Sequence, residues 1–205
     1  HLVRSKIYIA RSFARTNVLR LDIEHVTGKC KRRKDTTMKR IEPTEIADNP
    51  IEAIGREWML VTAGDQESFN TMTVSWGGTG YLWNRPVVFV FVRPERYTYE
   101  FIERRDAFTL SFLGPEYREA YRICGSKSGR DTDKVAEAGL TPFPTEAGNI
   151  AFEQARLTLE CRTLYAGALS EGLFVDPTIY PKWYGGAHGG DHKMYIAEIL
   201  RCWTR

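Results

Sequence analysis

The sequence has no apolar run long enough to cross a membrane and no closely paired cysteines. Its longest uninterrupted apolar run, residues 87–92, is six residues long, whereas a membrane-spanning helix needs roughly 20. The 4 cysteines are widely spaced and include no C-x-x-C pair, which excludes a disulfide-stapled scaffold and indicates a reducing compartment. We therefore expect a cytoplasmic protein without a membrane span.

The chain also lacks Ser/Pro-rich linkers, internal repeats and low-complexity blocks after Met38, which favours one domain over residues 38–205. With 42% hydrophobic and 27% charged residues it can form a packed core. The net charge of +3 is unevenly spread: residues 1–37 hold 10 Lys/Arg and 3 Asp/Glu, whereas residues 38–205 hold 19 and 23. The body is slightly acidic, so it carries no nucleic-acid footprint.

Residues 1–37 form a basic N-terminal extension that we do not include in the predicted fold. Three interpretations remain open: a non-native leftover ahead of a natural start at Met38, an Arg-rich targeting segment, or a polyanion-binding arm. The segment lacks the apolar h-region of a secretory signal. We expect it to be non-native or peripheral.

Short β-rich segments dominate the body. Strands are expected at residues 58–63, 69–76, 87–92, 107–112, 156–164 and 194–200, and helices at residues 43–55, 97–105, 115–124 and 131–138. The strands follow one another without regular strand-helix alternation, which argues against a doubly wound parallel sheet. The pattern predicts a mainly β protein, an antiparallel barrel with flanking α-helices.

The segment 69–76 alternates between its two faces. Met72, Val74 and Trp76 share one face, and Thr71, Thr73 and Ser75 share the other. We expect the row of small hydroxyls to face away from the core. The glycines of residues 77–80 do not spell a dinucleotide-binding fingerprint and fit a hairpin loop, beside which Trp76 and Trp83 could line a flat ligand.

Two loops are suited to an anion. Residues 124–131 combine glycines, hydroxyls and cations ahead of a helix that Asp131 would open, and residues 93–98 leave a central strand for a helix start. For each loop the alternative, a solvated loop or surface ion pairs, carries about equal weight. His188, Asp191 and His192 lie too irregularly for a metal centre, so we predict a structural loop and no metal.

Three blocks taken in series carry a resemblance. They are residues 70–78 (NTMTVSWGG), residues 83–86 (WNRP) with residues 93–98 (RPERYT), and residues 128–134 (SGRDTDK). Their order and spacing resemble the flavin reductase-like, FMN-binding split-barrel family of the flavoredoxin type, over about residues 40–200. The resemblance implies a Greek-key split barrel that forms a homodimer and binds FMN near the dimer interface.

The resemblance also implies which residues would hold FMN. The isoalloxazine would lie against the hydroxyl-bearing side of the segment and be held by backbone groups of Thr73, Val74, Ser75 and Trp76, with Asn70 and Thr71 leading in. The phosphate would be bound by Arg93, Arg96, Tyr97, Thr98, Ser126, Lys127 and Ser128. No catalytic side chain is named, because hydride transfer to a flavin needs no protein acid or base.

Three functions follow as hypotheses. The first is an NAD(P)H:flavin reductase-like oxidoreductase that passes hydride from a nicotinamide to flavin N5 and electrons on to an acceptor. The second is a flavin-binding electron carrier without its own nicotinamide site. The third is a flavin-free split-barrel binding module. Neither a nucleic acid nor a membrane is expected as a partner, and the sequence does not distinguish NADH from NADPH.

Overall fold

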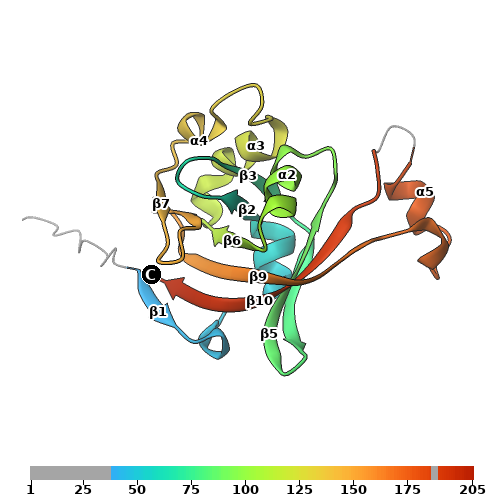
Figure 1. Ribbon diagram of the computed structural model, residues 1–205, viewed down its shortest axis with the longest axis horizontal. Helices are drawn as coiled ribbons and strands as arrows, with labels where there is room; N and C mark the ends of the chain where they lie inside the picture. Colours follow the sequence, from blue (N-terminus) through green and yellow to red (C-terminus); the bar gives the residue numbers. More distant parts are fainter. Residues whose placement is uncertain (1–37, 186–188) are drawn as a thin grey trace, which may run out of the picture. The chain divides into compact units, whose positions relative to one another are not determined.

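The computed structural model describes residues 38–185 and 189–205 (Figure 1). The expectations for residues 1–37 and for His188 therefore lie outside the described residues. The strands are β1 (Lys39–Ile41), β2 (Met59–Gly64), β3 (Phe69–Val74), β4 (Gly77–Leu82), β5 (Arg85–Val92), β6 (Ala107–Phe112), β7 (Pro142–Pro144), β8 (Ile150–Phe152), β9 (Leu157–Ala168) and β10 (Lys193–Thr204). The α-helices are α1 (Pro50–Glu52), α2 (Tyr97–Arg104), α3 (Arg118–Ser126), α4 (Lys134–Glu137) and α5 (Ile179–Trp183). Short 3-10 turns lie at Pro43–Glu45, Pro115–Tyr117 and Glu171–Leu173, and a π-helical turn lies at Ala53–Glu57.

One antiparallel sheet organises the described chain. Its strands follow the order β3-β2-β6-β9-β10-β5-β4, β1 pairs with β10, and β7 and β8 form a separate hairpin. The two end strands, β3 and β4, are joined only by Ser75 and Trp76, so Val74 and Gly77 are at most about 11 Å apart. The sheet therefore curls until its ends meet at this corner without pairing. The expected mainly β, antiparallel split-barrel fold with flanking helices is confirmed, and its sheet is not closed.

Long strands and bulges make this curl possible. β9 and β10 each run for 12 residues, and their register shifts between Ile196 and Ala197 and again between Ile199 and Arg201. Such irregularities bend a strand and increase its twist. β10 pairs with both β9 and β5, so it links the two halves of the barrel.

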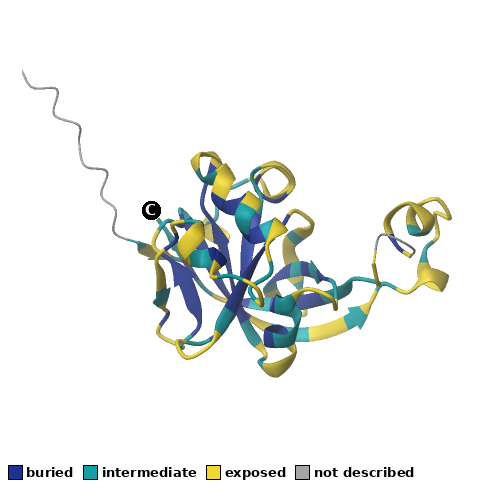
Figure 2. Ribbon diagram, turned by 90° about the horizontal axis from the view of Figure 1, so that it is seen from above, coloured by how far each residue is buried: buried dark blue, intermediate teal, exposed yellow. Residues whose placement is uncertain are grey.

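Two apolar cores lie on opposite faces of β2. Met59, Val61 and Ala63 point into the larger core, which side chains of β3, β5, β6, β9, β10 and α2 complete. Leu60 points to the other face. There, residues of α3 and β8 and of the segments next to them form the smaller core. Because β2 is buried on both faces, its sequence lacks polar alternation. Figure 2 shows this buried centre and a largely exposed extension that carries α5.

The glycine-rich residues 77–80 form strand β4, not the hairpin loop that the sequence favoured. The hairpin turn is Trp83-Asn84, where both residues have positive φ (52° and 57°), as a two-residue type I′ turn requires. Gly77 has no room for a side chain, because an added Cβ would lie 2.6 Å from Phe89 O on the neighbouring strand. At Gly78 and Gly80 an added Cβ would make ordinary contacts of 3.6 and 3.4 Å with the ring of Phe89.

The expected helix over residues 43–55 is divided into three short pieces. Pro50 starts a new helix, and the side chain of Asn49 caps it by accepting a 3.0 Å hydrogen bond from Ile51 N. The helix expected to begin at Asp131 begins at Lys134, because Asp133 caps it through a 3.0 Å bond to Ala136 N. The first segment does begin with a helical turn at Pro43, but the helix does not continue unbroken to residue 55. The start expected at Asp131 was wrong, because Asp133 is also able to serve as a cap.

Glu160 is a carboxylate buried completely in the sheet. It accepts hydrogen bonds from Asn149 Nδ2 (2.9 Å), from the Thr145 hydroxyl, and from Arg201 Nη1 on the neighbouring strand (2.8 Å). A buried charge is tolerated only when such partners satisfy it. Through Thr145 and Asn149, Glu160 fixes the turn of the β7–β8 hairpin over the sheet.

We predict that Arg201→Met lowers the free energy of unfolding by about 3–5 kcal/mol, because it leaves the Glu160 charge buried without its cation. Arg162→Met is the matched control, since Arg162 pairs with Glu198 on a more exposed part of the same two strands. The control should cost at most about 1 kcal/mol. Urea denaturation measures both, and equal losses in the two variants would contradict the role given to Glu160.

Candidate functional site

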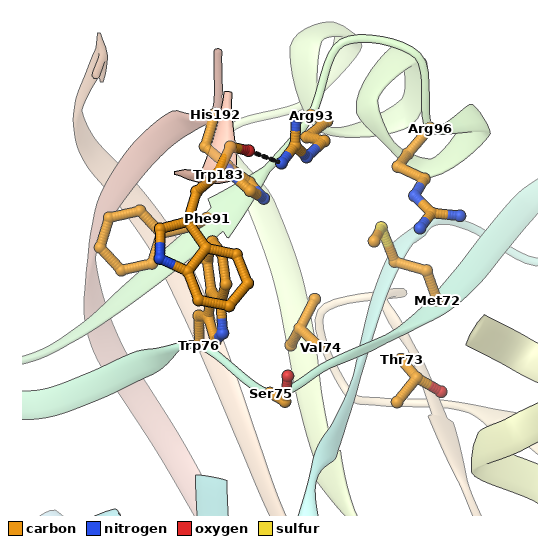
Figure 3. A pocket seen from close by; sticks show the side chains of 10 residues that line it. All are labelled: Met72, Thr73, Val74, Ser75, Trp76, Phe91, Arg93, Arg96, Trp183 and His192. Carbon is orange, nitrogen blue, oxygen red and sulfur yellow. Dashed lines mark hydrogen bonds between the residues drawn. The ribbon is translucent and has the colours of Figure 1, made fainter. Parts of the chain in front are cut away.

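A cavity of about 400 Å³ lies where the two ends of the sheet meet (Figure 3). Five consecutive residues of the β3–β4 corner, 72–76, form one wall. Phe91 and Arg93 at the end of β5, Arg96, Trp183 and His192 complete it. We call it the ring cavity, since its apolar and aromatic walls suit a flat ring system. Its described lining includes no carboxylate and two guanidinium groups, which favours a negatively charged ligand.

The ring cavity follows the free edge of β3 and not its hydroxyl face, which corrects the sequence-based expectation. Thr71 is fully buried, and its hydroxyl bonds to the Thr62 hydroxyl (2.8 Å) and to Val61 O (3.2 Å). The Thr73 hydroxyl donates to Tyr121 O of α3 (2.6 Å). The hydroxyl face is therefore covered by the protein, so Thr71 lies away from both cavities of the site.

What β3 offers a ligand is its backbone. Among the described residues β3 pairs with β2 alone, so one edge of the strand keeps peptide groups without a neighbouring strand. Thr73, Val74, Ser75 and Trp76, all expected at the ring, line the cavity along this edge. Unpaired backbone N–H and C=O groups beside an apolar wall can bind the polar edge of a flat ring.

A second cavity of about 310 Å³, here called the anion cavity, adjoins the first. The two cavities share Met72 and Arg96 in their linings. Six of the residues expected at a phosphate line the anion cavity: Arg96, Tyr97, Thr98, Ser126, Lys127 and Ser128. Asn70, expected at the ring, lines this cavity instead. The structure thus brings the loops at residues 93–98 and 124–131 together around one space.

The start of α2 points N–H groups toward the anion cavity. Tyr97 and Thr98 are the first helical residues, and no side chain caps this helix. Thr98 is held in place because its hydroxyl accepts a 2.7 Å hydrogen bond from Asn70 Nδ2. Exposed N–H groups at a helix start carry a partial positive charge that attracts anions. Local sequence at residues 93–98 was sufficient to indicate this feature.

Lys134 is the residue at this site that sequence reasoning left out of its list. The side chain is buried, and its Nζ donates to Cys124 O (3.3 Å) and Lys127 O (3.2 Å). Burial lowers the pKa of Lys134, and the charge of Arg96 acts in the same direction. No carboxylate of the described residues forms an ion pair with Lys134. The lining of the anion cavity also includes the carboxylates of Glu95 and Asp131, but neither forms an ion pair with Lys134. A buried cation without an ion-pair partner among the described residues is poised for an anionic ligand.

The loop side chains expected at a phosphate differ in whether they already have a hydrogen-bond or ion-pair partner. Lys127 pairs with Glu137, the Ser126 hydroxyl donates to Arg122 O (2.8 Å), and the Ser128 hydroxyl accepts from Arg130 N (3.2 Å). Arg96 makes only a 3.3 Å hydrogen bond to Gly125 O. The cations of the anion cavity without a described carboxylate partner are thus Arg96 and Lys134.

Arg93 lies on the ring cavity and not on the anion cavity where the sequence placed it. Its guanidinium donates to Gly190 O (2.7 Å) and to Trp183 O (2.8 Å), and it lies over the ring of Tyr184. These carbonyls belong to the extension between β9 and β10, here called the α5 arm (residues 169–185 and 189–192). Arg93 therefore holds the α5 arm, a contact between residues about 90 apart that local sequence does not reveal.

His192 and Trp183 bring the α5 arm onto the ring cavity. Both stand against Trp76, with ring centroids 5.0 and 5.3 Å away, respectively. Burial, and next the positive charges of Arg93 and Arg96, lower the pKa of His192 to about 4. The imidazole is therefore neutral near neutral pH, and its Nδ1 lies 3.3 Å from the Tyr184 hydroxyl. His192 thus lines the cavity without adding charge, and among the described residues no cluster suited to a metal was found.

This depressed pKa predicts a pH dependence of stability. An unfolded histidine takes up a proton near pH ~6.5, whereas folded His192 does so only at about 4. Between these values the unfolded chain binds the additional proton, so the free energy of unfolding falls as the pH falls. His192→Gln should remove this part of the slope in urea denaturation followed from pH 7 to pH 4. An unchanged slope would contradict the assignment.

Comparisons with known proteins place the chain in a family. A model of the flavin reductase like domain matches residues 51–205. Flavoredoxin of Desulfovibrio vulgaris is 25% identical, with a TM-score of 0.55 over 72% of this chain and 69% of that chain. An FMN-binding domain of a flavin reductases-like enzyme from Shewanella baltica is 18% identical, with a TM-score of 0.59 over 82% of this chain and 77% of that chain.

An NADH:FAD oxidoreductase of Streptomyces globisporus is 18% identical, with a TM-score of 0.51 over 71% of this chain and 73% of that chain. A search of curated proteins found no match. In the part of the chain that the structure describes, no helix is long and apolar enough to cross a bilayer. Because the family model matches most of the chain, the chain belongs to the flavin reductase-like family.

Proposed function

We propose that this protein binds FMN and acts as a flavin reductase-like oxidoreductase, which takes hydride from NAD(P)H and passes electrons on to an acceptor. The observation that carries the proposal is the meeting of the two cavities at Met72 and Arg96. One cavity suits a flat ring and the other an anion. FMN has the same two parts, a ring system and a phosphate joined by a short chain.

The ring end would be held by the free edge of β3. Val74, Ser75 and Trp76 line the ring cavity, where their backbone groups would bind the ring edge, and Phe91 supplies an apolar wall from β5. Hydrogen bonds from a fixed backbone orient a ring without side-chain reorganisation. The proteins of Desulfovibrio vulgaris and Shewanella baltica support the assignment, since their names describe a flavoredoxin and an FMN-binding domain.

The phosphate end would lie between the start of α2 and Lys134. The α2 N–H groups and Arg96, which precedes them, lie on one side of the anion cavity, and Lys134 comes from a second segment of the chain. An anion entering this space would give Lys134 the counterion that the described residues do not supply. A charge-assisted contact of this kind contributes about 1.5–3 kcal/mol.

Bound FMN would supply the redox chemistry, since its N5 can accept hydride. The protein's contribution is position and charge. Arg93 and Arg96 give the ring cavity a positive potential, and the described lining holds no carboxylate to oppose it. Neutral His192 can donate or accept a hydrogen bond there without repelling a cationic or anionic ligand.

A flavin-binding electron carrier is the second candidate, and one observation favours it. The indole of Trp183 stands over the ring cavity, against Trp76 (Figure 3). A nicotinamide stacked on a flavin in this cavity would compete with the indole for that space. If that position is permanently closed, the flavin exchanges only electrons with a partner.

A homodimer also belongs to the proposal. The β4–β5 hairpin presents Tyr81 and Trp83 with 72% and 54% of their surfaces exposed, and β4 pairs with β5 alone among the described residues. An exposed edge strand with aromatic side chains is suited to contact a second copy. Sedimentation of the purified protein at several concentrations measures this directly.

Lys134→Met should weaken FMN binding by about 10- to 100-fold and leave riboflavin binding nearly unchanged, because only FMN carries the phosphate. Lys127→Met is the matched control. It should cost much less, since Lys127 already pairs with Glu137. Fluorescence titration of both flavins measures the four ratios, and equal weakening of FMN and riboflavin by Lys134→Met would refute the phosphate assignment.

Mixing the FMN-loaded protein with NADH or NADPH without oxygen should bleach the visible absorption band of the flavin. Rapid bleaching with one or both donors supports the reductase. Stable yellow colour with both donors supports the electron carrier. A protein that does not retain FMN in equilibrium dialysis would be a flavin-free binding module, and the proposal would be wrong.

A further inference from the structure

The α5 arm is attached to the barrel by a small number of strong contacts close to the ring cavity. Arg93 donates to carbonyls on both sides of residues 186–188, at Trp183 (2.8 Å) and Gly190 (2.7 Å). Glu95 accepts a 2.5 Å hydrogen bond from Gly190 N, which is the largest cause of its lowered pKa. Arg93 and Glu95 stand side by side in the connection from β5 to α2. This connection therefore fixes where the arm meets the cavity.

The arm has its own aromatic packing, which keeps it in one conformation. Tyr180 stacks on Tyr184 with ring centroids 5.3 Å apart, and Phe174 lies 5.5 Å from both rings. The Tyr180 hydroxyl donates to Asp191 (2.9 Å). Trp183 is not part of this packing, since its indole turns from the arm toward Trp76 on the corner of the sheet. The arm thus presents Trp183 and His192 to the cavity, and Trp183 has the larger ring.

Trp183 is held firmly by its backbone and loosely by its side chain. The carbonyl is bound by Arg93, whereas the indole has one edge-to-face contact with Trp76 and remains 43% exposed. Lys182 is the other described residue that interacts with the ring, at 5.2 Å. A large aromatic ring in this state can rotate away at little cost, because it leaves few contacts behind.

The volume of the ring cavity limits what can bind beside the Trp183 indole. Small-molecule sites measure roughly 300–1,000 Å³, and the ring cavity, at about 400 Å³, lies near the lower limit. Trp183 lines this space and lies against Trp76. A second planar molecule stacked on a ring bound there would compete with the indole for the same space.

We propose that Trp183, positioned by Arg93, determines the specificity of the site by occupying the stacking place that a second planar ligand must take. This rests on the proposed function, in which the first ring is that of FMN. The indole is displaced by ligands that bind strongly enough elsewhere, and it excludes planar molecules that do not. Arg93 acts as a positioning residue, because it sets where the indole stands.

The test measures binding to the full chain and uses NAD⁺ as the probe, since it does not react with oxidised FMN. FMN titration comes first, for wild type and for each variant, so that NAD⁺ is added only to protein saturated with FMN. NAD⁺ is then titrated onto the FMN-loaded protein and followed by equilibrium dialysis. Trp183→Ala should tighten NAD⁺ binding by about 2- to 10-fold. Leu173→Ala, an exposed apolar residue of the same arm, is the control and should change neither affinity.

Arg93→Lys tests the positioning role, because lysine keeps the charge and cannot bind two carbonyls as a planar fork. It should tighten NAD⁺ binding in the same direction, and the double variant with Trp183→Ala should bind no tighter than Trp183→Ala alone. Gains that add in the double variant would separate Arg93 from Trp183 and refute its positioning role.

The outcomes separate this inference from the proposed function. If wild type does not bind FMN, the proposed function fails and NAD⁺ is not reached. If FMN binds and Trp183→Ala leaves NAD⁺ binding unchanged or weaker, the indole supports the second ligand or ignores it, and the inference is wrong. A loss of FMN affinity beyond tenfold in Trp183→Ala would place the indole on the first ring and also overturn it.

Discussion

The unpaired ends of the sheet are the constraint on which the site depends. β3 and β4 are joined by Ser75 and Trp76 alone and do not pair with each other, so the two ends of the sheet meet at this corner and leave one edge of β3 unpaired among the described residues. A closed barrel would use the peptide groups of β3 internally and leave none for a ligand. The split keeps that edge available and places the ends of β5 and α2 beside it. The position of the ring cavity is therefore a consequence of the strand order. The side chains that line it determine its size and charge.

The second element of the site is a charge imbalance that the fold tolerates. Lys134 is buried with two carbonyls as partners, and its lowered pKa shows that burial disfavours its charge. Glu160 is equally buried, yet Arg201 balances it on the next strand. We therefore assign Glu160 a role in structure and Lys134 a role in binding. Glu160, whose charge is balanced by Arg201, fixes the hairpin that it contacts. Lys134, whose charge has no ion-pair partner among the described residues, would attract an anion that enters the cavity.

Sequence reasoning succeeded where a property is local. The alternation of residues 107–112 gave β6 its full bounds, and the composition of residues 93–98 and 124–131 indicated an anion. It was wrong where a property depends on a distant neighbour. Gly77 of β4 lies too close to the Phe89 carbonyl on the next strand for a side chain, and Thr71 is covered by its own neighbour Thr62. Arg93 resembled a phosphate ligand until its carbonyl partners, some 90 residues away, were known.

The α5 arm shows why such distant contacts matter for function. Barrel strands are constrained by pairing on both sides, so they can vary little without loss of the fold. A connection between two strands is free of that constraint and can acquire its own packing, as the rings of Phe174, Tyr180 and Tyr184 have done. The guanidinium of Arg93 and the carboxylate of Glu95 then fix the position of the arm on the barrel. The barrel accordingly sets where a ligand can bind, and the arm can change which second molecule reaches it without disturbing the sheet.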